Sequence, residues 1–159
     1  MSQKTRPSGL VFSVSPLTKA KSVGRLAYMS DFINFKSLKR PPKPNTCLVA
    51  PENHCLAAEP DFEPPELAMT GRGLFSKLSE LVAGERRFGN IETDAEALRL
   101  KLVATTGLMR FKDDIDIEVI PLDEGRATFA IYSRSRVGYS DLGANRKRVA
   151  KIIERVTAI

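Results

Sequence analysis

Two arginines that alternate with serines near the C-terminus are the residues best suited to binding an anion. Arg134 and Arg136 lie two positions apart in the stretch YSRSRVGYSDLGANRKRV, so in a strand both project from the same face. A guanidinium pairs with carboxylate or phosphate through parallel hydrogen bonds, and a helix that starts nearby offers further N–H donors. The candidate anion- or ligand-binding residues are Arg134, Arg136, Tyr139, Ser140, Asp141, Asn145 and Arg146.

The same stretch also has a purely structural interpretation, as the joint between a strand and a helix. Gly138 permits a sharp turn, and Ser140 or Asp141 can cap the helix that follows. Asp141 would then also neutralise one arginine, and Asn145 would satisfy backbone groups at the end of the strand. Both interpretations stay open on the sequence.

An apolar turn is the second candidate site. The segment TTGLMRFKDD, residues 105–114, places large apolar side chains between charged ones. The candidate contact-loop residues are Leu108, Met109, Arg110 and Phe111. An apolar tip of this kind is either tucked under a neighbouring segment or used to touch a partner, and tucking under the proline-rich segment is the simpler expectation.

No pattern indicates a catalytic or metal centre. The single histidine, His54, stands next to Cys55 without the spacing that zinc sites use. Nucleophile-elbow, phosphate-loop and dinucleotide patterns are absent as well. We therefore predict no catalytic residue, no metal and no cofactor. Cys47 and Cys55 are expected to be free thiols in a reducing compartment.

Two helices and several strands must position these residues. A stripe of leucines predicts a first helix from Glu66 that ends at Gly84. A second helix, residues 144–157, has Arg148, Lys151 and Arg155 on its outer face. Its predicted inner stripe is Leu142, Asn145, Val149, Ile152, Ile153 and Val156.

Strict alternation of apolar and polar residues predicts strands with one wet face in residues 97–104, 115–121 and 126–133, and a weaker strand in residues 86–93. An antiparallel register places Leu100 opposite Ile117, and Lys101 opposite Asp116. A short turn with Gly125 in the left-handed conformation then pairs Ile117 with Ile131.

The predicted fold class is α+β: an antiparallel β-meander of about four strands, with an N-terminal and a C-terminal helix packed on one face. Three parts are expected: a basic arm in residues 1–34, an extended proline-rich wrapping segment in residues 35–65, and the core domain in residues 66–159. Prolines keep the middle segment extended.

The net charge of +6 belongs to the N-terminal part, because residues 1–44 carry nine Lys/Arg and one acid. Nucleic acid or an anionic membrane is therefore expected to bind only through residues 1–44. No apolar run is long enough to span a membrane or form a signal peptide, so we expect a soluble, cytoplasmic protein. Residues 1–30 also resemble a transit peptide, and Met29 is an alternative start.

Three segments together resemble the family known as domain of unknown function 1499. They are SRSRVGYSDLGANRKRV, the pair RPPKPNTCLVAPENHC and EPDFEPP, and LMRFKDDIDIEVIPL. The resemblance covers residues 35–156. The matching positions are Pro44, Asn45, Pro51, Phe111, Asp114, Ser133, Arg134, Ser135, Arg136, Gly138, Ser140, Asp141, Gly143, Asn145 and Arg146. Thr105 and Thr106 depart from the Arg-Ser that the family often has there, and the resemblance implies a domain without implying a reaction.

Three functions remain open. The first is a non-enzymatic module that binds an unknown small molecule or protein, which requires a cavity between sheet and helices. The second is an enzyme acting on a phosphorylated or carboxylated small molecule, with Asp141 as acid–base in an open cleft and the arginines as a clamp. The third is a protein that binds a membrane or nucleic-acid surface through its basic arm.

Overall fold

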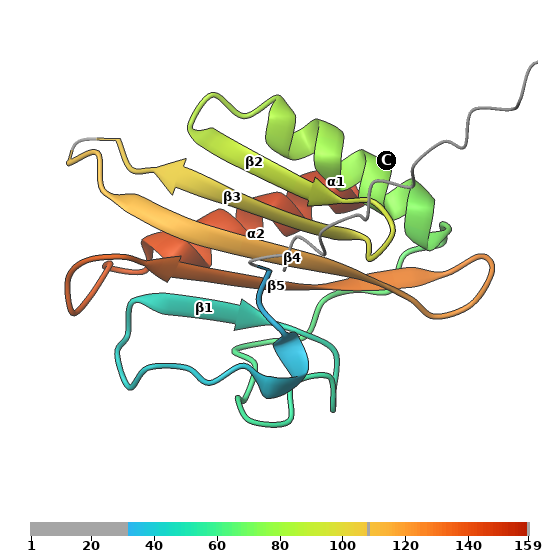
Figure 1. Cartoon of the computed structure of the whole chain (residues 1–159), viewed down its shortest axis with the longest axis horizontal. Coiled ribbons are helices and arrows are strands. Elements are labelled where there is room, and N and C mark those ends of the chain that lie inside the picture. The colour runs from blue at the N-terminus through green and yellow to red at the C-terminus, as the bar shows by residue number, and fades with distance from the viewer. Residues whose placement is uncertain (1–31, 108, 159) are drawn as a thin grey trace, which may run out of the picture. The chain divides into compact units, whose positions relative to one another are not determined.

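The centre of the folded chain is an antiparallel β-sheet that carries two helices. The computed structural model describes residues 32–107 and 109–158. The elements in these residues are, in order, η1 (Phe35–Ser37), β1 (Thr46–Val49), α1 (Gly71–Ala83), β2 (Phe88–Asp94), β3 (Arg99–Thr105), β4 (Lys112–Pro121), β5 (Ala127–Ser135) and α2 (Ala144–Thr157). The predicted α+β class and antiparallel meander are confirmed (Figure 1).

The sheet has five strands within the described residues, one more than the expected four or so. Its order is β1-β5-β4-β3-β2. The additional strand, β1, comes from the proline-rich segment and pairs with β5, with Cys47 opposite Ser133 and Val49 opposite Ile131. Four residues, TCLV, are too few to show an alternating pattern, so periodicity alone does not reveal this strand.

The predicted register of the three strands with clear alternation, β3, β4 and β5, is confirmed. Leu100 of β3 lies opposite Ile117 of β4, and Lys101 lies opposite Asp116. Ile117 also lies opposite Ile131 of β5. Apolar positions therefore meet apolar positions on one face throughout.

The turn between β4 and β5 differs from the expectation. Gly125 does not have a positive φ. The turn is instead closed by the amides of Leu122 and Asp123, which both donate to the carbonyl of Arg126, while the Asp123 side chain accepts from the Gly125 amide. Because hydrogen bonds close this longer loop, it needs no left-handed residue.

Helix α1 begins at Gly71, not at Glu66. The preceding Leu67 exchanges two backbone hydrogen bonds with Ala127 of β5, at 2.8 and 3.1 Å. Thr70 is the N-cap, and its hydroxyl accepts from the Gly73 amide at 3.0 Å. The helix was expected five residues too early because the spacing of Leu67 fits the helical stripe, although its backbone pairs with a strand.

Both helices cover the same face of the sheet. Leu74, Leu78 and Val82 of α1 and Val149, Ile152 and Val156 of α2 are buried against the inward residues of β3, β4 and β5. Figure 1 shows α2 running behind the strands. The predicted inner stripe of α2 is correct except for Leu142, which precedes the helix and is 90% exposed.

The opposite face, which was expected to be wet, is covered in part by the proline-rich segment. Phe35 of η1 packs there with Leu48, Ala130 and Tyr132, all of them buried. Asp116 lies on this face and is 1% exposed. The expectation failed because a segment without periodicity gives no sign of where it packs.

Candidate functional site

The two candidate arginines lie on the face of β5 that also carries Tyr132, as the alternation predicted. Arg134 Nη1 donates to Asp116 Oδ2 at 2.6 Å, and its guanidinium lies 5.3 Å above the ring of Tyr132. Arg136 Nε and Nη2 both donate to Asp114 Oδ1, at 3.0 and 2.7 Å. Burial raises the pKa of Asp116, and the hydrogen bond and charge of Arg134 oppose that shift.

Asp141 binds the start of α2 and not an arginine. Its Oδ1 accepts from the Gly143 amide at 2.9 Å, and its Oδ2 accepts from the backbone and side-chain amides of Asn145, both at 2.7 Å. The N-cap residue of α2 is Gly143, and Asp141 supports the helix start from two positions earlier; the expected neutralisation of an arginine by Asp141 is wrong among the described residues. An acid–base role needs Asp141 in an open cleft, and here both oxygens hold the helix start.

Asn145 joins three segments on the helix-covered face. It is fully buried, and its Nδ2 donates to the Asn45 carbonyl and to Ser135 Oγ, each at 2.9 Å. Its Oδ1 accepts from Ser133 Oγ at 2.5 Å. Ser133 and Ser135, the two serines that alternate with the arginines, thus hold α2 onto the end of β5, which is a structural role.

A buried ion pair that the sequence analysis missed completes this network. Arg148 Nη2 donates to Asp113 Oδ2 at 2.6 Å, while its Nη1 donates to Asn145 Oδ1 at 2.7 Å and to Ser133 Oγ at 3.2 Å. The side chains of Arg148 and Asp113 are 14% and 1% exposed. The expectation that Arg148 points outward is wrong.

A signal for this pair was present in the strand register. Ile115 of β4 lies opposite Ser133 of β5. Two residues further along the same register, Asp113 lies opposite Ser135, on the face that α2 covers. A buried aspartate there requires a cation from the helix. Arg148, one turn after Asn145, is the residue in place to supply it.

The remaining candidates point elsewhere. Tyr139 is 68% exposed, and Ser140 accepts from the Leu142 amide at 3.2 Å. The guanidinium of Arg146 lies 5.0 Å above the ring of Phe62. The seven candidate residues therefore do not converge on one site, because the two arginines lie on the outer face of the sheet, whereas the others belong to the loop after β5 and to α2.

Arg134 and Arg136 do border a hollow on the outer face. It measures about 380 Å³ and is also lined by Lys39, Lys43 and Asn45. An anion in this hollow would contact Lys39 and Lys43, whereas Arg134 and Arg136 are already paired with carboxylates.

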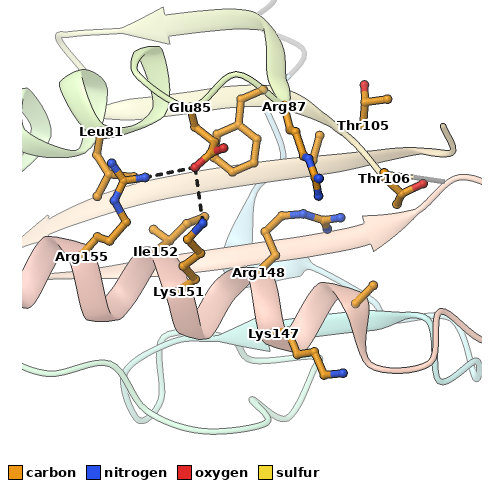
Figure 2. A pocket seen from close by; sticks show the side chains of 14 residues that line it. Leu81, Glu85, Arg87, Thr105, Thr106, Lys147, Arg148, Lys151, Ile152 and Arg155 are labelled. Carbon is orange, nitrogen blue, oxygen red and sulfur yellow. Dashed lines mark hydrogen bonds and ion pairs between the residues drawn. The ribbon is translucent and has the colours of Figure 1, made fainter.

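A second cavity lies between α2, the end of α1 and the β2–β3 edge of the sheet. Its volume is about 310 Å³. Its apolar lining consists of Leu81, Phe88, Ala104, Ala144 and Ile152. Figure 2 shows Arg87 and Arg148 reaching into the space from opposite sides, with Thr105 and Thr106 at one end.

Cations outnumber acids around this cavity. Its charged lining residues are Glu85, Arg87, Lys147, Arg148, Lys151 and Arg155. Glu85 lies 3.1 Å from Arg155 and 3.7 Å from Lys151, as the dashed lines in Figure 2 show. Arg148 is neutralised by Asp113. Arg87 and Lys147 have no ion pair within the described part of the chain, and Arg87 is the one of the two that reaches into the space in Figure 2.

The predicted contact loop is exposed. Met109 is 65% and Phe111 46% exposed, so tucking under the proline-rich segment is wrong for these residues. Leu108 lies outside the described residues, as do residues 1–31 of the predicted arm. Arg110 is exposed between the two apolar residues and has a φ of 52°.

The cysteines and the histidine lie apart from both cavities. Both thiols are free; Cys47 is in the core, where burial raises its pKa to about 11, and Cys55 packs on the other face of the sheet. Burial lowers the pKa of His54, whose Nε2 lies 3.9 Å from Glu118 Oε1. No group of three or more metal-ligating side chains occurs among the described residues.

The fold and the site define an α+β domain with a basic-rimmed, apolar-floored cavity beneath its C-terminal helix. The chain belongs to the family described as "Protein of unknown function (DUF1499)", which matches residues 38–156. No curated protein matches it. Among solved structures it is similar to the di-domain ARO/CYC BexL from the BE-7585A biosynthetic pathway, at 12% identity and a TM-score of 0.45. That match covers 58% of this chain and 43% of the other. Within the described residues, neither helix is long and apolar enough to cross a membrane.

Proposed function

We propose that the protein is a non-enzymatic binding module that holds a small amphipathic anion in the cavity beneath α2. The observation that carries this proposal is the lining: an apolar floor below a rim of five cations and one acid, in which only Arg148 has a further acid, Asp113, as its partner. A purely structural cavity of this size has no need of surplus positive charge. A ligand with a short apolar part and a carboxylate, sulfonate or phosphate group matches both features.

The volume limits the ligand. About 310 Å³ is at the lower end of the range for small-molecule sites, so the ligand is a small one or leaves part of itself outside. Arg87 is exposed and Arg148 is held in place by its buried pair, so we assign Arg87 to the anionic group and Arg148 to a fixed part of the wall.

Fluorescence titration with anilinonaphthalene sulfonate, an apolar anion, tests this proposal on the full chain. Decanoate should displace the probe and decanol, which has the same tail without the charge, should displace it poorly. Arg87→Ala should weaken binding of the probe about fivefold, because it removes one charge-assisted hydrogen bond at a partly exposed site.

Arg86→Ala is the matched control, since Arg86 is the adjacent exposed arginine and does not line this cavity. It should leave the affinity unchanged. A chain that does not bind the probe, or in which both alanine variants lose affinity equally, would contradict the proposal.

A further inference from the structure

Exposed apolar side chains gather at one end of the sheet. Eight large hydrophobic residues are substantially exposed among the described residues, and five of them belong to two loops at this end. These five are Met109, Phe111, Val137, Tyr139 and Leu142, with exposed fractions from 46% to 90%. We call residues 109–112 and 136–142 together the loop end.

The two loops are neighbours because of the strand register. The last pair of β4 and β5 is Asp113 with Ser135, and the amide of Arg136 then donates to the carbonyl of Lys112 at 3.3 Å. Both loops therefore leave the sheet at the same end, as Figure 1 shows at its left side. Two exposed apolar segments, far apart in the sequence, are thus part of one surface.

Each loop also has a residue in the left-handed region that is not glycine. Arg110 and Leu142 both have a φ of 52°. Glycine or asparagine would fit either position with less strain. Leu142 is disfavoured both by this conformation and by its 90% exposure to water, so nothing in the isolated domain explains a leucine there.

The charges of the loop end are one-sided. Arg110 and Lys112 are exposed and have no ion pair within the described residues. The neighbouring acids are engaged: Asp113 pairs with Arg148 beneath α2, Asp114 pairs with Arg136 on the outer face, and Asp141 accepts from backbone amides at the start of α2. The outward surface is therefore positive between its apolar side chains.

We propose that the loop end docks on the surface of an anionic lipid membrane. Single apolar side chains at the tips of projecting loops, with cations between them, can enter the headgroup region while the cations meet lipid phosphates. Lysine is depleted in protein–protein interfaces, so the exposed Lys112 next to Phe111 favours a lipid surface over a protein partner. This inference goes beyond the proposed ligand binding and does not require an occupied cavity.

The location of the cavity agrees with docking in this orientation. Thr105, Thr106 and Gly107 of its lining lead directly into one loop, and Ala144 follows the other. A docked chain would therefore hold the opening of the cavity close to the lipid headgroups.

Co-sedimentation of the full chain with vesicles tests the proposal. Vesicles of phosphatidylcholine alone should bind little, and those with about 30% phosphatidylserine should bind the chain and release it as salt rises from about 0.1 M to about 1 M. Failure to bind the anionic vesicles would overturn the proposal and leave the loop end for a protein partner.

Leu142→Asn separates docking from folding. Asparagine accepts the left-handed conformation, so the melting temperature should stay or rise, while binding to anionic vesicles should weaken about fivefold as apolar contact with lipid is lost. Leu56→Ser is the matched control, because Leu56 is 77% exposed and lies outside the loop end. Equal binding by both variants would overturn the proposal.

Charge reversal separates the loop end from the basic arm, which remains in every variant. Arg110→Glu should weaken vesicle binding roughly tenfold, since both the lost attraction and the new repulsion count. Arg72→Glu, an equal charge change on the exposed side of the first turn of α1, should have a small effect. If the two reversals weaken binding equally, the net charge or the arm causes binding, and the proposed surface is wrong.

Discussion

Replacing Arg148 by methionine removes the cation that compensates the buried carboxylate of Asp113. The side chain is 1% exposed, so it cannot turn to water when Oδ2 loses its 2.6 Å bond, and its Oδ1 has no hydrogen-bond partner among the described residues. Ser133 and Asn145 lose a donor as well. Breaking a buried pair costs about 3–5 kcal/mol of the free energy of unfolding. Arg148 is 14% exposed, so we expect about 3 kcal/mol, near the lower limit.

The reverse change, Asp113→Val, should cost less. The guanidinium of Arg148 keeps Asn145 and Ser133 as acceptors and can reach solvent. The double variant should be more stable than the sum of the two single effects predicts, because no uncompensated charge remains. Urea unfolding gives these free energies, and for a chain of this size 3 kcal/mol corresponds to a melting-temperature loss of roughly 10 °C.

The control is Arg126→Met, which breaks pairs whose side chains are about half exposed, with Glu66 and Asp123. It should cost less than about 1 kcal/mol. If Arg148→Met costs no more than this control, or if the double variant is strictly additive, the buried pair does not have the energetic role argued above.

Three further predictions concern single positions. Burial lowers the pKa of His54, so stability should be lost as the pH falls below 6.5, the pKa of this group in the unfolded chain. The imidazole titration in NMR spectra should have a midpoint below 6.5, and His54→Gln should remove the loss of stability. A midpoint at or above 6.5 would contradict it. Gly71→Ala should cost about 1–3 kcal/mol in urea unfolding, because its Cβ would lie 2.7 Å from Pro121, whereas Gly89→Ala meets nothing within 4 Å and should be neutral or slightly stabilising. Thr70→Ala should cost about 1 kcal/mol by losing the N-cap of α1, and Thr70→Ser should restore most of it; equal stability of the alanine and serine variants would be evidence against the cap.

The candidate site shows what a local alternation pattern can predict and what it cannot. Alternation along β5 correctly predicted that Arg134 and Arg136 share a face. The same alternation places Tyr132 on that face and the intervening serines on the other. It did not provide the partners of the arginines. Asp114 and Asp116 come from another strand, and identifying them needs the register to be extended to the end of the sheet.

The sequence by itself determined the class of fold, the register of β3, β4 and β5, and the inner face of α2. These features follow from the spacing of apolar residues, which repeats every 2 residues in a strand and every 3.6 residues in a helix. Only the tertiary structure decided that Arg148 turns inward, that the proline-rich segment supplies β1, and that the two exposed loops share one end. These features depend on contacts between distant segments without a period of their own, and the free energy of burial settles them only when the whole chain is packed.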